Sequence, residues 1–144
     1  ALILSSSLLN KIMRHSIISI SLIVVGNTSK AAPSHDDISR CFWVYAPMHE
    51  LAKEMQLVQL QSFTLGRIGW LGGYTQANIN NQQFKYSFES DLKNKKSQGI
   101  AMKGDMREAI LSMDEKKYEE IISKAIVCDK IIGIKTEFIP LIGR

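Results

Sequence analysis

Cysteine has the most definite chemistry in this 144-residue chain, which contains it twice, as Cys41 and Cys128. The sequence has no C-x-x-C motif, so nothing favours a redox pair. In an exported protein two cysteines usually form a structural disulfide, and here one intramolecular pairing exists. The bond would close a loop of 87 residues and join the first helix of the mature chain to the last. Two buried free thiols, or a reactive thiol, are the alternatives.

Histidine can serve as a metal ligand or a general base, and His49-Glu50 matches the start of the zinc-protease motif H-E-x-x-H. The motif fails because Lys53 occupies the position of the second histidine. A zinc site needs three or four ligands, and the one other histidine of residues 32–144 is His35. We therefore expect no metal, no cofactor and no enzymatic activity. A small hydrolase would need a cleft that holds His49, Glu50 and a hydroxyl group.

Aromatic and basic side chains mix with polar ones in the connection from Asn80 to Lys103. We take Tyr86, Lys93, Lys95 and Lys96 as the candidate surface for binding a protein partner. The lysines follow the aromatic residues and are expected to lead into a loop rich in serine and glycine. Three lysines in a loop could also touch anionic lipid headgroups or nucleic acid.

A stripe of small residues is expected on the second helix of the mature chain, Ser62–Asn78. Glycine costs about 1 kcal/mol against alanine inside a helix, so the four glycines of this segment need a reason. Gly69, Gly73 and Ala77 are spaced four residues apart and share one face, which predicts close packing of another helix there. A phosphate-binding loop is the alternative, but the spacing fits neither the dinucleotide fingerprint nor the P-loop.

The N-terminal region has the pattern of an export signal. Arg14 and His15 form a short positive region, residues 16–26 are apolar, and Ala31 ends a polar stretch with small residues at the cleavage positions. Cleavage would leave residues 32–144 as a single helical domain in the periplasm or outside the cell. The alternative is a membrane-tethered protein that keeps residues 1–26, although their apolar core is short for a spanning helix.

The charge of the chain depends on that cleavage. The whole sequence carries 18 basic and 14 acidic side chains, a net charge of +4. Residues 1–31 hold three of the basic residues and none of the acidic ones, so the mature chain has a net charge of +1. A nearly neutral domain gives no general argument for nucleic-acid binding.

Apolar residues recur every three to four positions in several segments, which predicts an all-α fold, a small bundle of four to five helices. The first helix starts near Ser34–Asp37, which can cap it, and runs to about residue 59, with a kink or a restart at Pro47. Residues 84–89 fit a helix, and a strand is the alternative. A loop with Ser97, Gly99 and Gly104 is expected to follow.

The last part of the chain contains the clearest helical pattern. Asp105 could cap a short helix, and Ser112 with Glu115 forms a capping-box pattern before the helix 116–132. Gly133 is the natural residue to end that helix. The tail, residues 134–142, is expected to be extended.

The segment Gly69–Asn78 (GWLGGYTQAN) resembles a stretch found in small exported helical proteins of proteobacteria. Some of these are similar to type VI secretion amidase-immunity proteins, and others to acid-stress periplasmic chaperones. The resemblance implies a helical domain tied by disulfides and assigns no site residue. Taken together, we expect a small exported binding protein, such as an immunity protein, an inhibitor or a chaperone-like factor, that acts on another protein.

Overall fold

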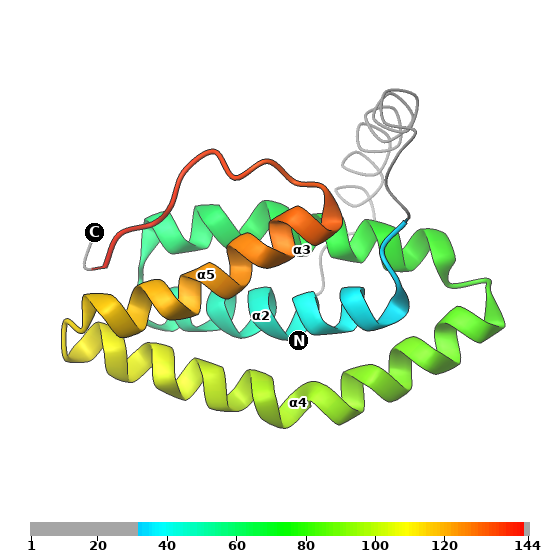
Figure 1. Cartoon of the computed structure of the whole chain (residues 1–144), viewed down its shortest axis with the longest axis horizontal. Coiled ribbons are helices and arrows are strands. Elements are labelled where there is room, and N and C mark those ends of the chain that lie inside the picture. The colour runs from blue at the N-terminus through cyan, green and yellow to red at the C-terminus, as the bar shows by residue number, and fades with distance from the viewer. Residues whose placement is uncertain (1–31, 143–144) are drawn as a thin grey trace. The chain divides into compact units, whose positions relative to one another are not determined.

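The computed structural model describes residues 32–142, which fold into four α-helices and no strand (Figure 1). The helices are α2 (His35–Glu54), α3 (Val58–Asn78), α4 (Gln82–Leu111) and α5 (Glu115–Ile132). The prediction of an all-α bundle is therefore confirmed. The export signal predicted for residues 1–31 lies outside the described residues.

Helix α2 is the centre of this bundle. It packs against each of the other three helices, and α4 also packs against α5 (Figure 1). Such packing buries an apolar core, which supplies most of the favourable free energy of folding. The largest fully buried apolar side chains come from all four helices: Ile38, Tyr45, Met48, Leu51, Leu60, Phe63, Met106 and Ile122.

Helix α2 begins where the sequence predicts, with Ser34 as the N-cap among the several candidates of Ser34–Asp37, and it ends before the predicted residue 59. The Ser34 hydroxyl accepts a hydrogen bond from the Asp37 backbone N–H, and the Asp37 carboxylate accepts one from the Ser34 backbone N–H. Pro47 lies inside the helix and is buried, without a restart. The helix ends at Glu54 because Gln56 adopts a left-handed conformation (φ 57°).

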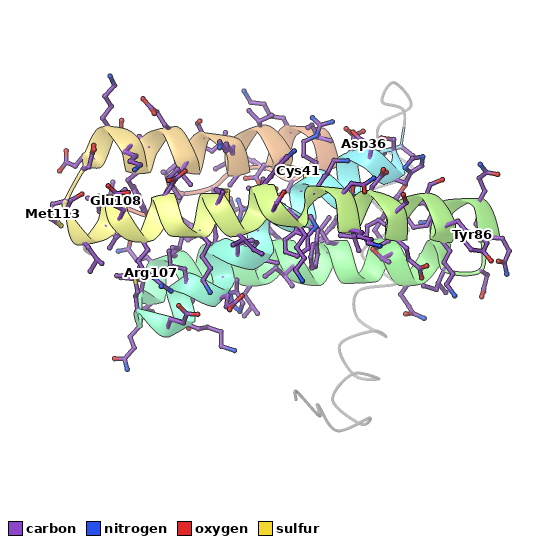
Figure 2. All side chains as sticks on the ribbon, turned by 90° about the horizontal axis from the view of Figure 1, so that it is seen from below. Asp36, Cys41, Tyr86, Arg107, Glu108 and Met113 are labelled. Atoms are coloured by element: carbon purple, nitrogen blue, oxygen red, sulfur yellow. A yellow bond between two sulfur atoms is a disulfide. The ribbon has the colours of Figure 1, made fainter. Side chains whose placement is uncertain are left out.

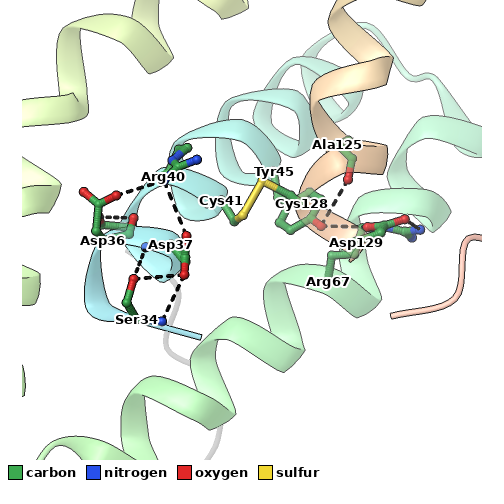
Figure 3. Close-up of a disulfide and its surroundings, with 11 residues drawn as sticks. Ser34, Asp36, Asp37, Arg40, Cys41, Tyr45, Arg67, Ala125, Cys128 and Asp129 are labelled. Atoms are coloured by element: carbon green, nitrogen blue, oxygen red, sulfur yellow. Dashed lines mark hydrogen bonds and ion pairs between the residues drawn. A yellow bond between two sulfur atoms is a disulfide. The ribbon is translucent and has the colours of Figure 1, made fainter. Parts of the chain in front are cut away.

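The disulfide joins the predicted pair of cysteines, Cys41 of α2 and Cys128 of α5 (Figure 3). Their Cα atoms lie 5.5 Å apart, within the usual range for a disulfide. Both cysteines are buried, and no free cysteine occurs in the described chain. The prediction that the bond ties the first mature helix to the last is confirmed.

The predicted loop between residues 97 and 104 is wrong, because α4 is one helix of 30 residues. Residues 84–89 are helical, as favoured, and the proposed short helix at Asp105 is part of the same α4. Gly99 does not end the helix. A Cβ atom built on it would lie 2.6 Å from Trp43 Cε3, so the glycine allows α2 and α4 to approach closely.

The connection from α4 to α5 differs from the predicted capping box. Asp114, rather than Ser112, is the N-cap of α5, and its carboxylate accepts a hydrogen bond from the Lys117 backbone N–H. The Ser112 hydroxyl donates instead to the Glu108 carbonyl oxygen at the end of α4. Gly133 ends α5 in the left-handed conformation (φ 78°), as predicted.

The tail after α5 has no regular secondary structure and is held by side chains. The Tyr118 hydroxyl donates to the Pro140 carbonyl oxygen (3.2 Å), and the Phe138 ring packs edge-on against Phe63. Within the described residues, no helix is both long enough and apolar enough to cross a membrane.

Candidate functional site

A groove lies between α4 and α5 with α2 as its floor; we call it the α4–α5 groove. The two helices meet at their connecting turn and diverge from it (Figure 1). The groove has a volume of about 310 Å³, at the lower end of the range for ligand sites. Trp43 and Val44 of α2, Gly99 and Met102 of α4, and Val127 and Ile131 of α5 form its mostly apolar walls.

Two fixed contacts set the shape of this groove. The disulfide holds α5 against α2, and Cys128 itself lines the groove. The Trp43 indole packs on Gly99 and donates a hydrogen bond from Nε1 to the Leu92 carbonyl oxygen (2.7 Å). The walls are thus held in place before any partner binds, which lowers the entropic cost of binding.

Three cations, Arg40, Lys95 and Lys124, line the groove, and no carboxylate does. Arg40 and Lys95 already have partners, because both form ion pairs with Asp36, at 2.9 and 2.5 Å. The hydrogen bonds from Lys95 and then Arg40 lower the pKa of Asp36. Lys124 has no ion-pair partner within residues 32–142. It is therefore the groove cation most available to an acidic ligand.

The partner-binding residues predicted from the sequence do not all come together. Tyr86, Lys93 and Lys96 are exposed on α4, and the side chain of Tyr86 lies at the far end of that helix from Met113 (Figure 2). Lys95 instead turns toward α2 and lines the α4–α5 groove. All four belong to α4, which continues through the positions where the sequence predicted a loop.

The small-residue stripe faces outward. Gly69, Gly73 and Ala77 of α3 are exposed, and a Cβ atom built on either glycine would meet no atom of the described chain within 4 Å. The prediction that another helix of this chain packs there is wrong for the described residues. The close approach occurs at Gly99, which lies on α4.

A buried ion pair that the sequence did not predict joins α3 to α5 (Figure 3). Asp129 accepts hydrogen bonds from Arg67 Nε (2.7 Å) and Nη2 (2.5 Å), from the Tyr45 hydroxyl (2.6 Å) and from the Thr136 hydroxyl (2.6 Å). Arg67 also donates to the Phe63 carbonyl oxygen and stacks over its ring. The signal in the sequence was a carboxylate on the apolar face of α5.

The charge of Asp129 is stabilised by its donors. Burial alone would raise the pKa of this carboxyl, but the hydrogen bonds from Arg67, Thr136 and Tyr45 outweigh it and lower the pKa. Burial and the bond to Asp129 raise the pKa of Tyr45. The network links three helices and the tail, and none of its residues lines the α4–α5 groove. Its role is therefore structural.

The catalytic hypothesis needs a cleft that holds His49, Glu50 and a hydroxyl group, and both residues are engaged by neighbouring side chains. His49 Nδ1 lies 2.8 Å from the hydroxyl of Thr64, and burial lowers the pKa of the imidazole. Glu50 pairs with Lys103 (2.7 Å). His49 and Glu50 do not line the α4–α5 groove, and residues 32–142 hold no cluster of three metal-ligating side chains.

A second surface lies where the tail passes the start of α5; we call it the corner patch. Its exposed apolar side chains are Met113, Ile139 and Leu141, and they surround a cavity of about 370 Å³. Glu115 and Glu119 are the charged residues that line it. The corner patch thus combines apolar side chains with negative charge, whereas the α4–α5 groove combines apolar side chains with positive charge.

Comparison with known proteins gives no match: no protein-family model, curated protein or solved structure is significantly similar to this chain. The resemblance of Gly69–Asn78 to small exported helical proteins therefore stays a prediction.

Proposed function

We propose that this chain is a small exported protein that binds another protein through the α4–α5 groove and carries no catalysis of its own. The groove is the observation that supports this proposal best, because its walls are apolar and its charged residues are all cations. A segment with apolar anchors flanked by carboxylates would match it. Immunity proteins, inhibitors and chaperone-like factors are classes that act by binding another protein.

Export is supported by the disulfide. Disulfides persist in oxidising compartments and are rare in the cytosol. The Cys41–Cys128 bond lies in the core between α2 and α5, where it would stabilise the groove as well as the fold. We therefore propose a location in the periplasm or outside the cell.

The binding proposal is tested by photo-crosslinking in the exported fraction of the native host. Val127 lines the groove and is 53% exposed, so a benzoylphenylalanine at this position would contact the partner. The matched control carries the same group at Val58 of α3, which is 71% exposed and lines neither the α4–α5 groove nor the corner patch. We expect an adduct with a different protein from position 127 and none from position 58.

The charge of the groove is tested in the same experiment. Lys124→Glu should reduce the adduct at least tenfold, whereas Lys130→Glu makes the same charge change at an exposed position of α5 outside the groove and should not. Equal yields from positions 127 and 58, or no effect of Lys124→Glu, would overturn the proposal. N-terminal sequencing of the same fraction separates a mature start at Ala32 from a tethered protein that keeps residues 1–26.

A further inference from the structure

The corner patch has the features of an interaction site. The exposed fractions of Met113, Ile139 and Leu141 are 58%, 50% and 54%. Met113 follows the C-terminal end of α4 and lies at the tip of the described bundle in Figure 2. Clustered apolar side chains with a polar rim mark protein-binding surfaces more often than isolated ones do. A flexible methionine at a tip adapts readily to an apolar groove.

The two surfaces of the molecule have opposite charge. Glu115 and Glu119 line the corner patch, which has no lysine or arginine among its lining residues. Arg40, Lys95 and Lys124 line the α4–α5 groove, which has no aspartate or glutamate. The two sets share no residue. One molecule could therefore offer its corner patch to a second molecule and still keep its own groove open.

The net charge of the domain does not oppose such a contact. Residues 32–144 contain 15 lysine and arginine residues and 14 aspartate and glutamate residues, so their net charge is only +1. Two copies then feel little overall repulsion, and the local charges of the two surfaces decide how they meet. Apolar anchors with carboxylates on one copy match apolar walls with cations on the other.

We propose that a second copy of this chain docks its corner patch into the α4–α5 groove. The inference rests on the proposed function, because it uses the same groove. Met113 enters between α4 and α5, and Glu119 pairs with Lys124. The contact is head-to-tail, since the two surfaces differ, and it generates a ring or an open chain of copies. A protein partner in the groove would compete with this self-association.

Sedimentation velocity of the purified mature chain over a range of concentrations tests the proposal. We expect the wild type to form assemblies larger than a monomer, with a dissociation constant that rises with salt concentration. Lys124→Glu and Glu119→Lys should each weaken self-association at least tenfold. Lys130→Glu and Glu120→Lys are the matched controls, because they make the same charge changes at exposed positions outside both surfaces.

Mixing the two weakened variants provides the sharpest outcome. The Lys124→Glu copy keeps an intact corner patch and the Glu119→Lys copy keeps an intact groove, so the mixture should associate where neither variant does alone. Met113→Gly, which removes the anchor at a left-handed position that suits glycine, should weaken assembly without unfolding the chain. A monomeric wild type, or assemblies that the two charge variants leave unchanged, would overturn the inference. Partner crosslinking at position 127 could still succeed in that case.

Discussion

At the scale of single residues, Gly99 sets the distance between α2 and α4. A methyl group at this position would lie 2.6 Å from Trp43 Cε3 and 3.1 Å from the Trp43 carbonyl oxygen. The backbone oxygen cannot rotate away as a side chain could. The same Trp43 forms the floor of the α4–α5 groove, so this one contact affects both stability and binding.

We expect Gly99→Ala to lower the free energy of unfolding by about 1–3 kcal/mol, as overpacking of a tight contact does. Gly104→Ala is the matched control on the same helix. It should raise stability by about 1 kcal/mol, since no atom lies within 4 Å of the place its methyl group would take and alanine favours the helix. Urea unfolding followed by circular dichroism measures both. Equal stabilisation by the two substitutions would contradict the close approach.

Asp129 is the residue whose protonation should matter most to stability. Its folded-state pKa lies below the ordinary value because Arg67, Thr136 and Tyr45 donate to it. A lowered pKa stabilises the folded state above the unfolded pKa of about 3.9, and this stabilisation is lost as the pH falls through the folded pKa.

We expect Asp129→Asn to cost about 3–5 kcal/mol at pH 7, because it leaves Arg67 buried without a counter-charge. Below pH 4, the free energy of unfolding of this variant should also decrease less than that of the wild type. Asp36→Asn is the control, since Asp36 forms ion pairs near the surface that contribute about 1 kcal/mol or less. Chemical unfolding at a series of pH values gives both numbers. Equal losses of stability in the two variants would contradict the prediction that the buried Asp129–Arg67 pair contributes more than the surface pairs of Asp36.

At the scale of helices, three helix ends share one geometry. Gln56, Met113 and Gly133 each follow a helix in the left-handed conformation. In each case the next N–H bonds to a carbonyl five residues back, from Leu57 to Ala52, from Asp114 to Ala109 and from Ile134 to Asp129. This is the Schellman arrangement. In the sequence, Gly133 predicts the end of α5. Gln56 and Met113 are residue types that do not predict the ends of α2 and α4.

Replacing the glycines of α3 by alanine should change stability in the opposite direction to Gly99→Ala. Gly69→Ala and Gly73→Ala add a methyl group into open space in the described chain, so each should stabilise the protein by about 0.5–1 kcal/mol. Thermal unfolding of each variant against the wild type measures this. A loss of stability would mean that some other part of the protein covers this face of α3.

At the scale of the whole molecule, the disulfide connects the two ends of the described fold. It joins α2 to α5 across 87 residues, which in the chain-entropy model corresponds to roughly 4–5 kcal/mol. Small domains are stable by about 5–15 kcal/mol in total, so this single bond is a large share.

Replacing Cys41 and Cys128 together by serine should lower the free energy of unfolding by about 2–5 kcal/mol. Reduction with dithiothreitol should have a similar effect on the wild type and none on the double variant, which is the control. Urea unfolding with and without reductant separates these cases. An unchanged midpoint for the reduced wild type would show that the bond contributes nothing to stability.

The sequence alone determined the helical class, the pairing of the two cysteines and the end of α5 at Gly133. These features follow from local spacing or from simple counting, because apolar periodicity reports a helix and two thiols allow one bond. The start of α2 near Ser34–Asp37 was also predicted, since it depends on neighbouring residues, and the structure decided that Ser34 and Asp37 form the cap.

The tertiary structure decided what each glycine and each charge does. Gly99 looked like a loop residue and is a contact point, whereas Gly69 and Gly73 looked like contact points and face outward. Arg67 and Asp129 lie 62 residues apart in the sequence, and the residues around each of them do not predict that α3 and α5 bring them together. The α4–α5 groove likewise exists because α4 continues past residue 97 and diverges from α5. Local spacing encodes helices, but only their packing determines which side chains meet.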